Sequence, residues 1–293
     1  MLGVQVVAGS NPVVPTKGLR RIFPPEADIR VHEPQVTNDM NKARILITND
    51  DGIYAPGIIA LAEALEPAGE VTVVAPDRER SASSHAISLH RPLRVWEIAP
   101  HRFACDGTPT DSVYLGVNHI MAANKPDLVV SGINLGSNMA DDVTYSGTLA
   151  GAFEGTILRV PSIAISLEGR SPWDFTVAKE FICSLASAVL ARGLPPGVLL
   201  NVNVPPGKPE GYRVTKLGRR KYSEKIDVRE DPRGGRYFWI GGPGKDHEDI
   251  PNSDCNTVID DSLISVSPFH LDLTAHHAID LIRNWKLDGF DAG

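Results

Sequence analysis

The feature that most constrains the fold is a series of short apolar runs, most of them followed by a segment with helical periodicity. The runs occupy residues 45–47, 71–75, 127–132, 162–166 and 198–204. Runs that are apolar almost throughout are typical of strands buried on both faces, and alternation with helices is typical of parallel β-α units. The sequence therefore predicts a doubly wound, Rossmann-like α/β fold with a mostly parallel sheet.

Two adjacent carboxylates, Asp50 and Asp51, come directly after the first run. In open α/β sheets, ligands bind beyond the carboxyl ends of the strands, which is where this pair falls. Neighbouring carboxylates repel each other, and a hard divalent cation with oxygen ligands relieves that repulsion. The alternative is an Asx turn in which Asp51 and Gly52 are simply turn residues. This segment alone does not decide between the two interpretations.

Two further polar loops are expected at the same edge of the sheet. One covers residues 76–85 and contains the hydroxyl of Ser81, and the other is a long loop over 133–142 that leads to a helix start at Ser146-Gly147-Thr148. Such a helix start presents N–H groups to an anion, although simple N-capping is the favoured interpretation of this segment alone. The loops together offer carboxylate, hydroxyl and amide oxygens, which suit Mg²⁺ or Mn²⁺ better than zinc. A metal beside an anion site predicts metal-assisted phosphoester hydrolysis, with water as the nucleophile.

Composition limits the class of partner. The formal charge of -7 argues against a general nucleic-acid-binding surface, but not against a small phosphate ligand held through a metal. The three cysteines (Cys105, Cys183 and Cys255) are widely spaced, which fits reduced thiols in a cytoplasmic protein without a disulfide framework. No run of 18 or more apolar residues occurs, so no membrane span is expected.

Two parts of the chain depart from the rhythm of strand and helix. Residues 1–39 contain scattered prolines and no sustained period, so we expect a poorly ordered tail or a true start at Met40. Residues 40–293 are expected to form the α/β domain, and within it the Gly- and Pro-rich residues 207–260 are expected to form a β-hairpin or arm that makes subunit contacts. The basic run Arg219-Arg220-Lys221 in this arm is interpreted as a solvated face, with a phosphate-facing role as the less favoured alternative.

From about Ala43 to Trp285 the sequence resembles the SurE family of survival-protein nucleotidases. The resemblance rests on separated motifs in the same order along the chain. They are Asn49-Asp50-Asp51-Gly52 with Ala55-Pro56-Gly57, and the segments at 75–81, 107–111, 131–134, 145–148 and 269–274. Any one of these motifs would be weak evidence, whereas their joint occurrence is specific.

The resemblance implies a phosphohydrolase for nucleoside 5′-monophosphates that in many members also accepts 3′-nucleotides and in some accepts short polyphosphate. It implies one divalent cation per subunit, and a homodimer or homotetramer with the 207–260 arm exchanged between subunits. The implied metal ligands are Asp50, Asp51, Ser81 and Asn134, of which the two aspartates are also the catalytic residues. The implied phosphate- or substrate-binding residues are Asn49, His85, Asn138, Ser146, Gly147 and Thr148.

Three questions stay open at this point. The fold is compatible with a non-catalytic nucleotide-binding or regulatory module, because fold does not determine function. A glycosyl-transfer enzyme that uses a nucleotide sugar would also place a metal beside an acidic loop. For hydrolysis, the general acid that protonates the leaving ribose oxygen is either metal-bound water or His85.

Overall fold

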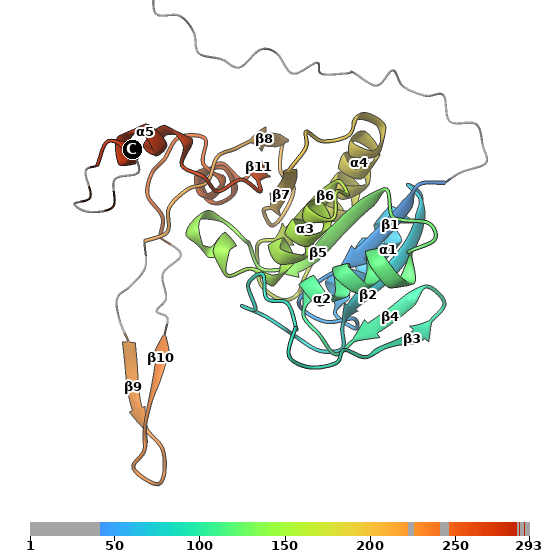
Figure 1. The fold of residues 1–293 in the computed structure, drawn as a ribbon, viewed down its shortest axis with the longest axis horizontal. Coiled ribbons are helices and arrows are strands. Elements are labelled where there is room, and N and C mark those ends of the chain that lie inside the picture. The colour runs from blue at the N-terminus through green and yellow to red at the C-terminus, as the bar shows by residue number, and fades with distance from the viewer. Residues whose placement is uncertain (1–41, 222–225, 241–245, 286, 288–289, 291–293) are drawn as a thin grey trace, which may run out of the picture. The chain divides into compact units, whose positions relative to one another are not determined.

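The computed structural model describes residues 42–221, 226–240, 246–285, 287 and 290 (Figure 1). The expectation for residues 1–39 lies outside these residues. Among the described residues, nine strands form one sheet. They are β1 (Arg44–Thr48), β2 (Glu70–Pro76), β3 (Val95–Ala99), β4 (Arg102–Cys105), β5 (Leu128–Leu135), β6 (Ser162–Leu167), β7 (Val198–Val204), β8 (Tyr212–Val214) and β11 (Ile264–His270).

The strand order is β3-β4-β2-β1-β5-β6-β7-β11-β8. The central strands from β4 to β7 all pair in parallel. Antiparallel pairing appears only toward the edges of this sheet, where β3 pairs with β4 and β11 pairs with β7. The mostly parallel α/β fold predicted from the apolar runs is therefore confirmed.

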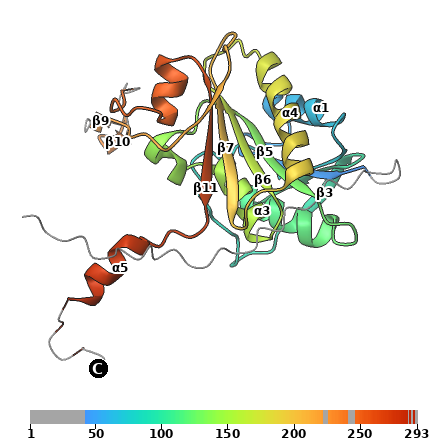
Figure 2. The ribbon, with the colours of Figure 1, turned by 90° about the horizontal axis from the view of Figure 1, so that it is seen from above.

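Helices cover both faces of the sheet. The main helices are α1 (Pro56–Leu65), α2 (Pro109–Leu115), α3 (Gly147–Ile157), α4 (Thr176–Arg192) and α5 (His276–Arg283). Single π-helical turns lie at Gly116–Ile120 and Asn256–Asp260, and a 3-10 turn lies at Ala140–Thr144. Figure 2 shows α1 and α4 on one side of the central strands and α3 on the other.

The first strand shows why its sequence is apolar throughout. Successive residues of a strand point to opposite faces. Ile45 and Ile47 pack in the cluster that includes Ile58 of α1, whereas Leu46 between them packs in the cluster that includes Val113 of α2. Both faces of β1 are therefore buried.

One strand is longer than the sequence indicated. The apolar run ends at Gly132, and the residues after it were expected to form a loop. In the structure β5 continues to Leu135, because its pairing with β6 resumes after an irregularity, with Asn134 opposite Ser166. Asn134 therefore lies on the end of a strand, where its backbone is held by the sheet.

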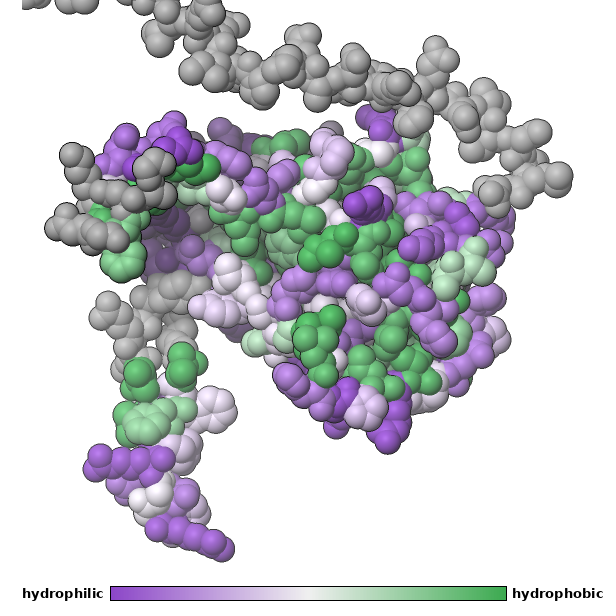
Figure 3. Space-filling view, in the orientation of Figure 1, coloured by the Kyte–Doolittle hydropathy of each residue, from purple (hydrophilic) through white to green (hydrophobic). Residues whose placement is uncertain are grey.

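The region 207–260 contains a two-stranded antiparallel hairpin of β9 (Ile226–Glu230) and β10 (Arg236–Ile240), whose strands pair only with each other among the described residues. Every residue of both strands is exposed, including Phe238 and Trp239. Figure 3 shows apolar side chains at the base of this hairpin and polar ones at its tip. Helix α5 likewise buries none of its residues. No helix in the described parts of the chain is long and apolar enough to cross a bilayer.

Candidate active site

The candidate site lies where the connections of the sheet change direction. Strand β1 pairs with β2 on one side and with β5 on the other, so the chain leaves β1 and β5 toward opposite edges. This change of direction opens a crevice at the carboxyl ends of the two strands. Asp51 follows β1, and its Oδ2 accepts a 3.3 Å hydrogen bond from the backbone N–H of Leu135 at the end of β5. The strand order thus joins segments 84 residues apart.

A cavity of about 490 Å³ occupies this position. It brings together six of the predicted site residues, namely Asp50, Asp51, Ser81, Asn134, Asn138 and Ser146. Glu79, Asp142 and Tyr145 also line it and were not predicted as site residues. Glu79 belongs to the motif at 75–81 and Tyr145 to the motif at 145–148. Their position in these motifs is the signal in the sequence that could have marked them as site residues.

The two aspartates occupy an environment that disfavours negative charge. Asp50 is 5% exposed, and burial raises the pKa of its carboxyl group above the ordinary value. Burial, together with the charge of Asp50, raises the pKa of Asp51 to about 6. The negative charge of Glu79 acts in the same direction on both. A divalent cation between the carboxylates would remove the repulsion and replace the lost hydration.

Neutral oxygens complete a donor set suited to such a cation. The amide nitrogen of Asn134 donates a 2.7 Å hydrogen bond to the carbonyl oxygen of Gly136, which leaves its Oδ1 as the acceptor atom. Ser81 donates its hydroxyl proton to Glu79 at 2.7 Å and keeps oxygen lone pairs for a ligand. Among the described residues, no three His, Cys, Asp or Glu side chains are grouped as metal ligands. The set of two carboxylates, one hydroxyl and one amide oxygen therefore fits a hard cation such as Mg²⁺ or Mn²⁺, and not zinc.

The start of α3 lies against the aspartates. The Ser146 side chain caps this helix by accepting a 3.1 Å hydrogen bond from the N–H of Leu149. A Cβ atom on Gly147 would lie 2.8 Å from the Cβ of Asp50 and 2.9 Å from its Oδ2. Only glycine allows this approach. It brings the positive end of the helix next to the carboxylates, where a phosphate held by a cation would meet it.

Three of the predicted substrate-binding residues have side chains that are already engaged. Asn49 is fully buried, and its amide nitrogen and oxygen both bind the backbone of Gly52. Thr148 is fully buried and donates its hydroxyl to Asp50. The amide nitrogen of Asn138 donates to Ser166, 2.8 Å away. Asn49 therefore stabilises the loop after β1, and Thr148 orients the carboxylate of Asp50.

Asn138 is held by its backbone as well. Its N–H donates to Oδ1 of Asn203, and its carbonyl oxygen accepts hydrogen bonds from the side chains of Asn201 and Asn203. Both asparagines are fully buried on β7, and neither was singled out in the sequence. Their side chains attach the backbone of Asn138 to β7. The position of Asn138 in the wall of the cavity is therefore held by the sheet.

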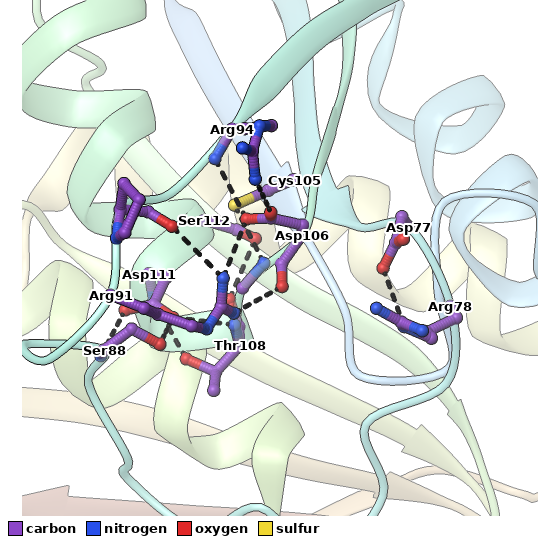
Figure 4. A network of polar contacts seen from close by, with 12 residues as sticks. Asp77, Arg78, Ser88, Arg91, Arg94, Cys105, Asp106, Thr108, Asp111 and Ser112 are labelled. Atoms are coloured by element: carbon purple, nitrogen blue, oxygen red, sulfur yellow. Dashed lines mark hydrogen bonds and ion pairs between the residues drawn. The ribbon is translucent and has the colours of Figure 1, made fainter.

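The loop with Ser81 and His85 is attached near its C-terminal end, and the residues that follow it are attached to α2. Its Ser84 donates backbone and side-chain hydrogen bonds to the carbonyl oxygens of Tyr145 and Thr144, at 3.1 and 2.8 Å. Further along, Ser88 binds the carboxylate of Asp111, which also closes the capping box of α2 (Figure 4). His85 itself lines a neighbouring cavity of about 810 Å³, and Ser146 lines both cavities.

The basic run in the arm does not form a uniformly solvated face. The side chain of Arg220 is 11% exposed and forms a 2.9 Å ion pair with Asp142, which lines the cavity of the aspartates. The interpretation of the whole run as a solvated face is wrong for this residue, because the arm packs back against the 140–144 turn. Arg220 thereby links the arm to the site.

Comparison with known proteins gives a consistent result. A family model described as Survival protein SurE matches residues 45–224. The chain is 54% identical over 249 residues to the 5′-nucleotidase SurE of Myxococcus xanthus (strain DK1622), which covers 85% of this chain and 95% of that protein. It is 50% identical over 247 residues to the 5′-nucleotidase SurE of Geobacter sulfurreducens (strain ATCC 51573 / DSM 12127 / PCA), covering 83% and 94% of the two chains.

Structural comparison agrees with the sequences. The crystal structure of the SurE protein from Aquifex aeolicus matches with a TM-score of 0.74 and 40% sequence identity. The match covers 82% of this chain and 98% of that chain.

Proposed function

Because the chain belongs to the SurE family, we propose that it is a 5′-nucleotidase, which hydrolyses nucleoside 5′-monophosphates to nucleoside and phosphate with the help of a divalent cation. The observation that carries this proposal is the convergence of Asp50, Asp51, Ser81 and Asn134 in one cavity beside the N-terminus of α3. The names of the similar proteins support the same activity.

Electrostatics explains why a cation belongs in this cavity. A phosphate group would meet the carboxylates of Asp50, Asp51 and Glu79 there, and like charges at close range repel. A bound divalent cation supplies positive charge to the phosphate oxygens and makes a coordinated water more acidic. Asp50, Asp51, Ser81 and Asn134 are the proposed ligands, with one Mg²⁺ or Mn²⁺ per subunit.

The rest of the site binds and orients the substrate. The N–H of Leu149 is taken by the Ser146 cap and that of Thr148 binds Asp50, so the N–H of Gly147 and the hydroxyl of Ser146 are the proposed donors to phosphate oxygens. Asn138 also lines the cavity and is held by its contacts with β6 and β7. Thr148 keeps the Asp50 carboxylate in one orientation, so the metal ligand needs little rearrangement when the substrate arrives.

We further propose that the protein is a homodimer or homotetramer in the cytoplasm. The exposed apolar side chains of the β9–β10 hairpin and the unburied helix α5 support subunit contacts through these elements. The cysteines are free, as in a reducing compartment. Light scattering coupled to size exclusion would test the assembly, and a monomer at micromolar concentration would contradict it.

The activity is tested by phosphate release from a panel of nucleoside 5′- and 3′-monophosphates and a short polyphosphate. Each substrate is assayed after chelation and after adding back Mg²⁺ or Mn²⁺. We expect metal-dependent release from the 5′-monophosphates. Nucleotide binding without phosphate release, from a folded sample with either metal, would favour the non-catalytic binding module. Release of a nucleoside diphosphate from a nucleotide sugar, without phosphate release from the monophosphates, would favour the glycosyl-transfer alternative.

A further inference from the structure

A buried glutamate contacts the histidine of the second polar loop. Nε2 of His85 lies 2.9 Å from Oε2 of Glu154, and the two residues are 69 positions apart in the chain. Glu154 belongs to α3, and its side chain is 8% exposed, whereas the side chain of His85 is 36% exposed. A carboxylate this deeply buried needs a partner, and the imidazole provides one.

This contact determines which ring nitrogen of His85 binds the carboxylate. A carboxylate only accepts hydrogen bonds, so Nε2 of His85 must carry a proton to bind it. Nδ1 lies on the other side of the ring and makes no hydrogen bond within the described part of the chain. The ring of Phe153 lies next to the imidazole, with its centroid 6.2 Å away. Glu154 thus fixes the tautomer and the orientation of His85 and leaves Nδ1 for a proton transfer.

The cavity of His85 adjoins the cavity of the aspartates. Ser84, the neighbour of His85, is bound to the carbonyl oxygen of Tyr145, directly before Ser146. His85 and Ser146 line the cavity of about 810 Å³, and Ser146 also lines the cavity of the aspartates. A phosphomonoester whose phosphate binds beside Ser146 therefore has room for its organic part in the cavity of His85.

We propose that Glu154 is a positioning residue that holds His85 as the general acid for the leaving ribose oxygen, an inference that rests on the proposed nucleotidase function. In this step, water oxygen bonds to phosphorus while the bond between phosphorus and the ribose oxygen breaks. The electron pair of the broken bond stays on the ribose oxygen, which takes the Nδ1 proton of the imidazolium. His85 becomes neutral, keeps its Nε2 proton on Glu154, and regains a proton from solvent. The attacking water releases its own proton to solvent.

The other titratable groups that line the cavity of His85 are Lys216 and His270. The ring of His270 is held by a different kind of contact, because its Nδ1 accepts a 2.9 Å hydrogen bond from the backbone N–H of Asp272. Glu154 is the carboxylate that contacts the imidazole of His85. His85 is therefore the histidine of this cavity whose ring is held by a buried carboxylate.

The test compares substrates whose leaving groups differ in their need for a proton. A nucleoside 5′-monophosphate expels an alkoxide and needs an acid, whereas p-nitrophenyl phosphate expels a stable phenolate and does not. For His85→Asn, we expect kcat with the nucleotide to fall about 100-fold and kcat with p-nitrophenyl phosphate to change by less than about 3-fold. For Glu154→Gln, which keeps an acceptor oxygen, we expect a loss of about 10-fold with the nucleotide alone, and a larger one for Glu154→Ala.

Glu63→Gln serves as the matched control, because Glu63 also pairs with a cationic side chain, Lys179 at 2.7 Å, but on the exposed surface of α1 and α4. Glu63→Gln should leave kcat unchanged with both substrates. Thermal melts of every variant verify folding. Equal losses on both substrates, or no loss on either, would overturn the role of Glu154 and His85 while leaving the nucleotidase function intact. A wild-type protein inactive on both substrates with Mg²⁺ and Mn²⁺ would instead overturn the proposed function.

Discussion

The hydroxyl of Thr148 donates a 2.6 Å hydrogen bond to Oδ1 of Asp50 and so joins the first turn of α3 to the end of β1 across 98 residues. Both side chains are buried. The contact leaves the second carboxylate oxygen of Asp50 beside Gly147, where the helix presents its N-terminus. The orientation of a proposed metal ligand thus depends on a helix start that is distant in the sequence.

Replacing Thr148 by valine should test this dependence. The change keeps the shape of the side chain and removes the hydroxyl, so Oδ1 of Asp50 loses a partner in a buried position. An unsatisfied buried acceptor costs about 1–3 kcal/mol of unfolding free energy. We expect Thr148→Val to lower stability by this amount in urea unfolding and to weaken Mn²⁺ binding in calorimetry.

Thr156→Val is the control for that experiment. Thr156 lies on the same helix and is also buried, but its hydroxyl donates to the carbonyl oxygen of Ala152 within the helix. Its loss should cost no more than about 1 kcal/mol, the typical net value of a hydrogen bond, and should leave metal binding unchanged. If both variants bind Mn²⁺ like the wild type, the contact with Asp50 does not orient the metal site.

The substitution Asp51→Asn should abolish most of the activity by removing one of two anionic metal ligands. Loss of a residue that only supports a metal ligand typically lowers activity about 10–100-fold. We expect turnover to fall further than this, because Asp51 is itself a proposed ligand. Binding of Mn²⁺, measured by calorimetry on the same sample, should weaken in parallel. Wild-type turnover with the metal still bound would remove Asp51 from the ligand set.

The raised pKa of Asp51 predicts how the metal-free protein responds to pH. Its value is about 6 in the folded protein, against 3.8 for an unperturbed aspartate, so the folded state keeps this proton at pH values where the unfolded chain has lost it. Stability therefore decreases as pH rises through this window, and the full penalty is present above about pH 6.

The corresponding measurement is the Tm after chelation, between pH 4 and 7, for the wild type and Asp51→Asn. The decline with rising pH should be steeper in the wild type, and the variant should be the more stable of the two at pH 7. Adding Mg²⁺ or Mn²⁺ at pH 7 should raise the Tm of the wild type. It should raise the Tm of the variant less. Parallel curves for the two proteins would contradict an elevated pKa at Asp51.

Gly147→Ala should damage the site through a steric conflict. The new methyl group would lie 2.8 Å from Cβ of Asp50 and 3.0 Å from Oγ of Ser83, which forces the helix start and the carboxylate apart. Overpacking of this kind costs about 1–3 kcal/mol, and we expect activity to fall by at least about 10-fold because a metal ligand is displaced. Gly211→Ala is the control, since a Cβ there meets no atom within 4 Å. Normal phosphate release by Gly147→Ala would show that the close approach is not needed.

Much of the fold could be predicted because burial on both faces leaves a local record. A strand such as β1 must be apolar at every position to fill the cores on its two sides, and this pattern is visible in Ile45, Leu46 and Ile47. The acidic pair after β1 was likewise visible, because its position follows from the strand that precedes it. The end of β5 was not predictable, since Asn134 is held there by pairing with β6 and not by its own propensity.

The sequence by itself determined the type and order of the secondary structure elements, the adjacent carboxylates Asp50 and Asp51, and the motifs of the SurE family. Only the tertiary structure decided which strand ends are neighbours, and therefore that β5 brings Asn134 to Asp51. It also decided that Glu154 reaches His85 and that Arg220 reaches Asp142. The physical reason is that hydrophobic periodicity records whether a residue is buried, whereas the partner of a polar side chain depends on how distant segments pack together.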